Sequence, residues 1–279
     1  MTVLLSLLAA ASYGVADFNG GWVSKRVSAW AVALTAQLSG ALVTLVIALL
    51  AAGRPSGSDL AWALLAGIGN GFGTSFLYRG LASGRMGVVA PVSGVGAAVV
   101  PVVAGVLLGE RPGPVVWLGI AVALPAIWFV SREPAAPEGA GTAGSTGFLD
   151  GVLAGLGFGV LFIALSRVSE DAGLIPLALN QAVAGVAIVA VALALRQPWL
   201  PRDPRVALAV TSGLLGAVAT GLFMVASRGS HLTVASVVVS LYPAFTVRLA
   251  AAVLRERVHG AQGIGLALCA VSVALVAAG

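Results

Sequence analysis

Asp17 is the residue of this sequence whose type and position most clearly suggest chemistry, because it is an acid inside a long apolar segment. A carboxylate within a membrane span is costly to bury and usually faces the interior of a helix bundle. Small and polar residues recur around it at spacings of three and four, which places them on one helix face. They are Ser6, Ala10, Tyr13, Asp17 and Gly20. We hypothesise that this face is a wall of a solute pathway and that Asp17 binds a cation or a proton there.

A structural role for Asp17 is the alternative, because Asp17 is near the end of its segment and could cap backbone or pair with Lys25 or Arg26. If Asp17 instead faces a cavity, partial desolvation disfavours its charged form and would let it exchange a proton as the cavity opens to either side. Arg248 is midway along a later apolar segment and is the candidate charge partner. Spacing alone does not fix the helix rotations that would bring Arg248 to Asp17.

Uncharged polar and aromatic side chains are the candidates for a binding wall. Asn70, Thr74 and Tyr78 are at positions i, i+4 and i+8 of one segment, so they share a helix face. A ligand site is typically apolar with a few polar groups, although hydrogen bonding between helices is the alternative role for each polar residue. The predicted substrate-binding residues are Tyr13, Asn70, Thr74, Tyr78, Phe158, Phe162, Phe223, Ser240 and Tyr242.

The sequence lacks the motifs of the common catalytic sites. It contains no H-E-x-x-H, no Walker loop, no G-x-S-x-G elbow and no paired carboxylates within one apolar segment. Cys269 is the single cysteine, which excludes an intramolecular disulfide and a cysteine-based metal site. We therefore expect no enzyme activity, no cofactor and no metal site. The Lys and Arg residues are spread singly along the chain, which argues against nucleic-acid binding.

Composition identifies the elements that must position these residues. The chain is 59% hydrophobic and 9% charged, whereas soluble proteins are roughly 25% charged. A span of the bilayer needs about 20 mostly apolar residues. Ten segments qualify, and we predict a transmembrane helix for each: Thr2–Trp22, Ala29–Ala52, Leu60–Leu81, Val88–Leu108, Pro114–Ser131, Gly147–Arg167, Leu174–Leu195, Val206–Ser227, Val234–Leu254 and Gly260–Ala278. The cavity is expected among the first, third, fourth, sixth, eighth and ninth of these helices.

An internal duplication relates the two halves. Glu110-Arg111 and Glu256-Arg257 are 146 positions apart, and each pair separates two apolar runs. The segment REPAAPEGAGTAGST has the composition of a flexible linker, so we predict repeats at 1–131 and 147–279 with a linker at 132–146. Because five spans per repeat is odd, the repeats must be inverted in the membrane. The two Glu-Arg pairs are at span ends, where a topological or helix-capping role is favoured over a functional one.

Two stretches resemble the EamA-type transporters of the drug/metabolite transporter superfamily. They are FLYRGLASGRMGVVAPVSG and ASVVVSLYPAFTVRLAAAVLRERVHGAQGIGLAL, and the resemblance extends over essentially the whole chain. Two departures are Arg255, where the family usually has Gly before the Glu, and the charge of Arg248. The resemblance implies ten helices in two repeats and export of amino acids, related metabolites or drugs.

Together these features predict an all-α integral membrane protein of ten helices in two inverted five-helix repeats. We expect a secondary transporter that moves small organic solutes across the inner (plasma) membrane by alternating access; the alternatives are a membrane scaffold or lipid-handling protein, and a channel. Its expected partners are a small-molecule substrate, the lipid bilayer and protons. Lys and Arg are commoner in the loops after odd-numbered spans, which places both termini outside, whereas the resemblance implies the cytoplasm. We predict only that both termini share one side.

Overall fold

The structure, a computed structural model, describes all residues except 51–52, 83–85, 131–143, 229–230, 255–259 and 279. The described residues form helices and no strands. The α-helices are α1 (Thr2–Ser24), α2 (Ala29–Leu50), α3 (Gly57–Ala82), α4 (Met86–Leu107), α5 (Pro114–Val130), α6 (Gly144–Leu165), α7 (Ile175–Ala194), α8 (Ala209–Ala226), α9 (Leu232–Val239), α10 (Tyr242–Leu254) and α11 (Gly260–Ala278). Two short 3₁₀ helices, η1 (Glu170–Ala172) and η2 (Pro204–Leu208), precede α7 and α8.

Length and composition make six described helices suitable to cross a membrane, namely α1, α2, α3, α6, α7 and α8. Four further apolar helical segments are shorter and are in α4, in α5, across α9 and α10, and in α11. These ten apolar segments fit the ten predicted spans. The predicted linker lies outside the described residues, apart from residues 144–146, which belong to the first turn of α6.

The ninth predicted span is the one that the structure divides. α9 ends at Val239 and α10 begins at Tyr242, and the intervening turn is closed by a hydrogen bond from the amide N–H of Ala244 to the carbonyl oxygen of Leu241. Pro243 explains the break, because proline has no amide N–H and its ring clashes with the preceding helical turn. The division places the side chain of Tyr242 at the start of α10, in the middle of the bundle.

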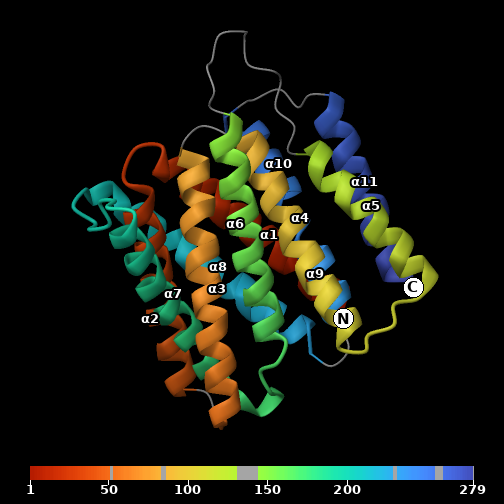
Figure 1. Cartoon of the computed structure of the whole chain (residues 1–279), viewed down its shortest axis with the longest axis horizontal. Coiled ribbons are helices and arrows are strands. Elements are labelled where there is room, and N and C mark those ends of the chain that lie inside the picture. The colour runs from red at the N-terminus through yellow and green to blue at the C-terminus, as the bar shows by residue number, and fades with distance from the viewer. Residues whose placement is uncertain (51–52, 83–85, 131–143, 229–230, 255–259, 279) are drawn as a thin grey trace.

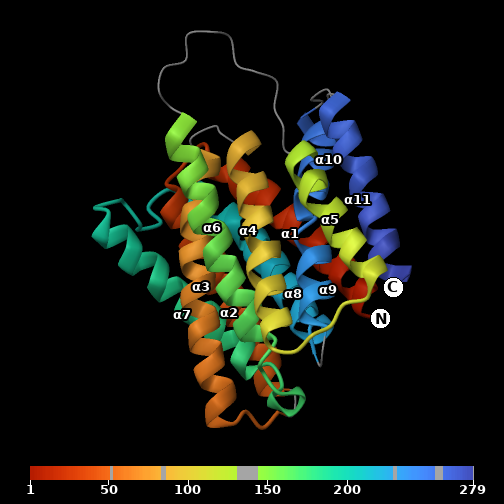
Figure 2. The same ribbon diagram turned by 45° about the vertical axis from the view of Figure 1, so that its right-hand side comes forward.

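Figures 1 and 2 show one bundle in which α5 and α11 lie together at one side and α7 lies at the opposite side. The N- and C-terminal ends of the chain lie close to each other in both views. The two halves of the chain interlock rather than sit side by side: α3 packs along α6, α1 along α8, α2 along α7, and α5 along α11. The middle of the bundle is therefore built from both halves.

Glycines allow α3 and α6 to approach backbone to backbone. A Cβ atom at Gly69 would lie 2.6 Å from the carbonyl oxygen of Gly157, and a Cβ at Gly157 would lie 2.5 Å from the amide nitrogen of Gly73. Such distances leave no room for a side chain, so the small residues are required by helix packing. The glycines of these two spans therefore serve helix packing.

Polar contacts fasten both ends of α3 to the second half of the chain. At its beginning, the Asp59 carboxylate accepts hydrogen bonds from the amide N–H of Ser169 (2.8 Å) and from its hydroxyl (3.0 Å). At its end, the guanidinium of Arg79 forms an ion pair with Asp150 of α6, with an Nε–Oδ1 distance of 2.9 Å. The Arg79–Asp150 contact could not be read from the sequence, because Asp150 is 71 residues from Arg79.

Glu110 has a capping role across the two halves. Its carboxylate accepts hydrogen bonds from the amide N–H groups of Leu232 (2.7 Å) and Thr233 (2.9 Å) at the beginning of α9. A carboxylate there satisfies backbone donors that have no partner within the helix and opposes the positive end of the helix dipole. This geometry agrees with the structural role predicted for the first Glu-Arg pair, while Glu256 lies outside the described residues.

Candidate functional site

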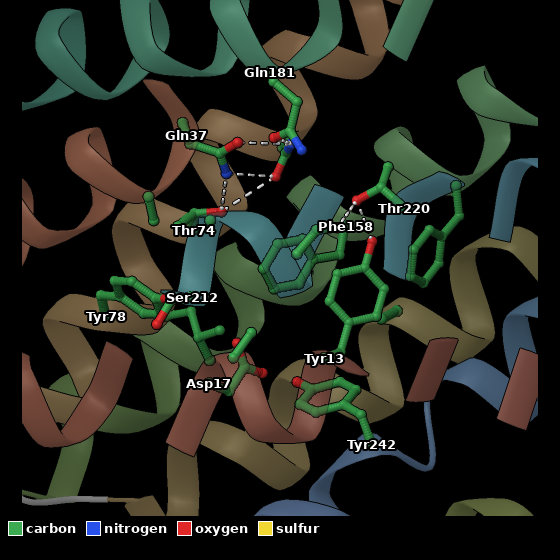
Figure 3. A pocket seen from close by; sticks show the side chains of 18 residues that line it. Tyr13, Asp17, Gln37, Thr74, Tyr78, Phe158, Gln181, Ser212, Thr220 and Tyr242 are labelled. Carbon is green, nitrogen blue, oxygen red and sulfur yellow. Dashed lines mark hydrogen bonds between the residues drawn. The ribbon is translucent and has the colours of Figure 1, made fainter. Parts of the chain in front are cut away.

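A cavity lies in the middle of the bundle where the two halves meet (Figure 3). It contains about 630 Å³ of empty space, counting the part open to solvent. Its described walls come from α1, α2, α3, α4, α6, α7, α8 and α10. The polar and aromatic lining residues are Tyr13, Asp17, Gln37, Asn70, Thr74, Tyr78, Phe158, Phe162, Gln181, Ser212, Thr220 and Tyr242.

Asp17 is the only charged side chain among the described residues that line the cavity. It projects from α1 and is half-buried. The two ion pairs found among the described residues, Arg79–Asp150 and Arg205–Asp203, do not involve it. Arg26, one of the cations considered as its partner, instead lies over the ring of Trp22, at 3.8 Å from the ring centroid. Asp17 therefore contributes a carboxylate to the cavity without a counter-charge from the described part of the chain.

Three tyrosines surround this carboxylate in Figure 3: Tyr13, Tyr78 and Tyr242. The Tyr13 hydroxyl lies 2.8 Å from the Thr220 hydroxyl, which donates to the Gly216 carbonyl oxygen; Tyr13 is therefore the donor of the first bond. The hydroxyl of Tyr242 donates to that of Ser93 at 3.3 Å. These bonds fix the rings of Tyr13 and Tyr242 beside the empty space.

Phenylalanines continue the aromatic wall on α6. Phe158 and Phe162 are one turn apart and line the cavity. The ring of Phe162 stacks on that of Phe223 with 4.2 Å between centroids and lies 6.4 Å from that of Tyr13. Aromatic pairs at these separations are favourable beyond the area that they bury. Phe223 thus supports the wall from behind.

An amide cluster forms the other polar part of the cavity, shown at the top of Figure 3. The side-chain amide of Gln37 donates to Asn70 (3.1 Å) and to Thr74 (3.2 Å), and that of Asn70 donates to Gln181 (3.5 Å). The cluster joins α2, α3 and α7 and carries no net charge. The amide nitrogen of Asn180 beside it has no hydrogen-bond partner.

The structure places most of the predicted site residues together. Asp17 and seven of the nine predicted substrate-binding residues line the cavity, namely Tyr13, Asn70, Thr74, Tyr78, Phe158, Phe162 and Tyr242. Phe223 is fully buried behind Phe162, and Ser240 is buried at the break between α9 and α10, so neither is among the lining residues. Whether any of these residues binds a solute stays a prediction.

Arg248 is not at the cavity. Its side chain is exposed on α10, and neither ion pair among the described residues includes it. The sequence placed Arg248 correctly within an apolar helix but did not reveal which face of that helix it occupies.

Two lining amides, Gln37 and Gln181, were not among the predicted site residues, and the helices that carry them, α2 and α7, were not among the expected walls. Their spacing in the sequence could have indicated that they belong together. They are 144 residues apart, close to the offset between the two repeats, so they occupy related places in the two halves.

The described residues contain no group of three or more His, Cys, Asp or Glu side chains that could hold a metal ion. The arrangement can bind a solute through one carboxylate, aromatic faces, hydroxyls and neutral amides.

Comparison with known proteins supplies independent information. The model of the EamA-like transporter family matches residues 1–132 and again residues 145–278. A solved structure described only as a crystal structure of a protein aligns with 99% of this chain and 98% of its own, with a TM-score of 0.71 and 18% sequence identity. At that identity the likeness concerns the fold alone. A search of curated protein sequences gave no significant match.

Proposed function

Because the chain belongs to the EamA-like transporter family, with two family repeats that cover almost all of it, we propose that it is a secondary transporter of small organic solutes. The family indicates a membrane transporter rather than an enzyme. We further propose that the protein works by alternating access, that it exports its solute, and that it lies in the inner (plasma) membrane. The solutes implied by the resemblance are amino acids, related metabolites and drugs; a nucleic-acid partner is not proposed.

The observation that carries the proposal is the central cavity, whose walls come from both halves of the chain. Transporters built from inverted repeats place the solute at the interface of the repeats near the middle of the bilayer, and one repeat then moves against the other. A site of this kind can open to either side without moving itself. Both termini on one side of the membrane would follow from ten spans.

Asp17 is our candidate for coupling transport to protons. The titratable lining groups that face it are Tyr13, Tyr78 and Tyr242. Of the cations near the ends of neighbouring helices, Arg79 pairs with Asp150, Arg205 pairs with Asp203, and Arg248 is exposed on α10. Arg228, just after α8, is partly buried and its Nε has no hydrogen-bond partner, but it does not line the cavity. A carboxylate with no fixed counter-ion in the cavity can take up and release a proton as its access changes.

Proteoliposome counterflow tests the proposal. Vesicles containing the purified full-length protein would be loaded with an unlabelled solute and given the same solute in labelled form, across a panel of amino acids, amines and amphipathic drugs. A carrier gives saturable, transient accumulation of label above equilibrium, whereas a channel gives only equilibration. Lack of flux for the whole panel would favour the alternative, a non-transporting scaffold or lipid-handling protein.

A further inference from the structure

We propose that the solute is a monovalent organic cation with an apolar or aromatic body, bound with its charged nitrogen against Asp17. The inference rests on the proposed transport function and narrows its substrate class. It favours amines over amino acids, because a free carboxylate on the solute would meet no positive charge in the described part of the cavity.

The charge of the described lining residues favours a cationic solute. They include one carboxylate, Asp17, and no lysine, arginine or histidine. Burying an ion without a partner is strongly unfavourable, whereas an opposite charge compensates much of the lost hydration. An anion would remain unpaired and would lie near Asp17. A zwitterion would satisfy Asp17 with its ammonium group but bring an uncompensated carboxylate with it.

Three other buried or partly buried carboxylates near helix ends contrast with Asp17. Asp59 accepts hydrogen bonds from Ser56 and Ser169, Glu110 caps α9, and Asp150 pairs with Arg79. Each of these acids therefore has a structural partner that explains its position. Asp17 instead lines the cavity, and no described residue forms an ion pair with it. A carboxylate retained in a span without a structural partner is best explained by a ligand that it binds.

The aromatic rings of the cavity also favour an organic cation. Tyr13, Tyr78 and Tyr242 surround Asp17, and Phe158 lies farther along the same wall (Figure 3). Ring faces attract organic cations through their quadrupoles, most strongly where water is excluded. The same rings provide the apolar surface that the body of such a cation would cover. A carboxylate within an aromatic wall thus suits an ammonium group that carries hydrocarbon better than it suits a hydrated metal ion.

The neutral amides of Gln37 and Gln181 mark the opposite end of the cavity from Asp17 in Figure 3, and Gln37 is hydrogen-bonded there to the amide of Asn70. Their donors and acceptors can exchange bonds with a neutral polar group of the solute, such as a hydroxyl or a carbonyl. They provide no formal charge to hold a second ionised group. The preferred solute is therefore charged at one end only.

A matched set of ligands with the same phenyl body tests this inference on the wild-type protein. Binding of 2-phenylethylamine, 2-phenylethanol, 3-phenylpropanoate and L-phenylalanine would be measured by isothermal titration calorimetry on the full-length protein in lipid nanodiscs at neutral pH. We expect the amine, which is a cation there, to bind at least about tenfold more tightly than each of the other three. Equal or tighter binding of phenylalanine or of the propanoate would overturn the inference.

Variants locate the effect at Asp17. Asp17→Asn should reduce the preference for the amine over the alcohol by about tenfold or more, and Asp17→Glu should retain most of it. Asp203→Asn is the matched control, since it removes one carboxylate from an exposed site; the Arg205 guanidinium holds the pKa of Asp203 at about 2, so that group is ionised at neutral pH. An unchanged preference in a folded Asp17→Asn protein would contradict the assignment.

Failure of this inference can be told apart from failure of the proposed function. If counterflow is seen with amino acids or anions but not with amines, the protein is a transporter and the substrate class is wrong. If the amine binds selectively through Asp17 but no solute gives counterflow, the cation site stands and the transport proposal fails.

Discussion

At the scale of single residues, Asp17 is an ionisable residue that lines the cavity, and neither ion pair among the described residues includes it. Its carboxylate lies where a membrane protein would not keep one for stability alone, because an unpaired buried charge opposes folding. The phenols of Tyr13 and Tyr242 are fixed by hydrogen bonds to hydroxyl groups of other helices. Proton exchange at Asp17 and access of water to the cavity can therefore both be tested at single residues.

Replacing Asp17 should remove any response of transport to a proton gradient. An asparagine has nearly the same shape as aspartate but cannot release a proton, so the residual flux through Asp17→Asn should be the same with and without a pH difference across the vesicle membrane. Asp17→Glu should keep the response. The measurement is solute flux in proteoliposomes at equal and at unequal internal and external pH. A variant that responds to pH like the wild type would leave Asp17 with a structural role.

Single cysteines should report whether water reaches the cavity. In a Cys269→Ala background, cysteines replacing Tyr78 or Phe162 should react with a small aqueous thiol reagent, although both native side chains are at most 4% exposed. A cysteine replacing Leu161 is the control, because Leu161 adjoins Phe162, is 1% exposed and does not line the cavity. Mass spectrometry would measure the extent of labelling. Protection of both cavity positions under all conditions would place the solute pathway elsewhere.

At the scale of helices, the contact between α3 and α6 is tightly constrained. Glycine backbones touch at its centre, and polar groups fasten α3 to the second half at both ends. α3 and α6 are suited to move as a unit. Sliding one helix along the other would separate the glycine contacts, the Asp59 hydrogen bonds and the Arg79–Asp150 ion pair at once. The α9–α10 break beside Tyr242 is a different kind of element, since it interrupts the backbone hydrogen bonds of one span.

A methyl group added at Gly157 should destabilise the protein, because its Cβ would lie 2.5 Å from the amide nitrogen of Gly73 and backbone atoms cannot move aside cheaply. Overpacking of this kind typically costs about 1–3 kcal/mol. Gly263→Ala in α11 is the control, since its Cβ meets no atom within 4 Å and the substitution favours the helix. Thermal unfolding in detergent would compare the two. Equal melting temperatures would mean that α3 and α6 separate readily enough to admit the methyl group.

At the scale of the whole molecule, the two family repeats are interlocked. α3 of the first half packs along α6 of the second, and α1 packs along α8, so the contacts between halves run through the middle of the bundle. Separating the halves would expose the cavity, the glycine contact and the Asp59 and Asp150 interactions together. The fold is consequently one unit, although the sequence is a duplication.

Cutting the chain between the repeats should therefore leave a folded complex. From its composition we predict that the segment 132–146 contributes little to folding, because it can bury no apolar face. A protease site introduced between residues 132 and 143 should be cleavable in mild detergent, and the two fragments should elute together in size-exclusion chromatography with an unchanged melting temperature. Separation of the fragments directly after cleavage would contradict the interlocked arrangement.

The sequence by itself determined the membrane class, the helical segments, the two repeats and eight of the twelve polar and aromatic residues that line the cavity. Apolar runs of about 20 residues set where spans must be, and the constant offset of about 146 residues revealed the duplication. Tyr13 and Asp17, and likewise Asn70, Thr74 and Tyr78, were found because helical spacing puts them on shared faces. These inferences need only local geometry.

Only the tertiary structure decided which of these faces meet. Helix rotation and neighbour choice place Gln37 and Gln181 in the cavity, Phe223 behind its wall, and Arg248 on the surface. The pairs Arg79–Asp150 and Glu110 with the start of α9 join groups 71 and at least 122 residues apart. Spacing along one helix cannot fix such contacts, since each depends on how two helices are turned about their own axes.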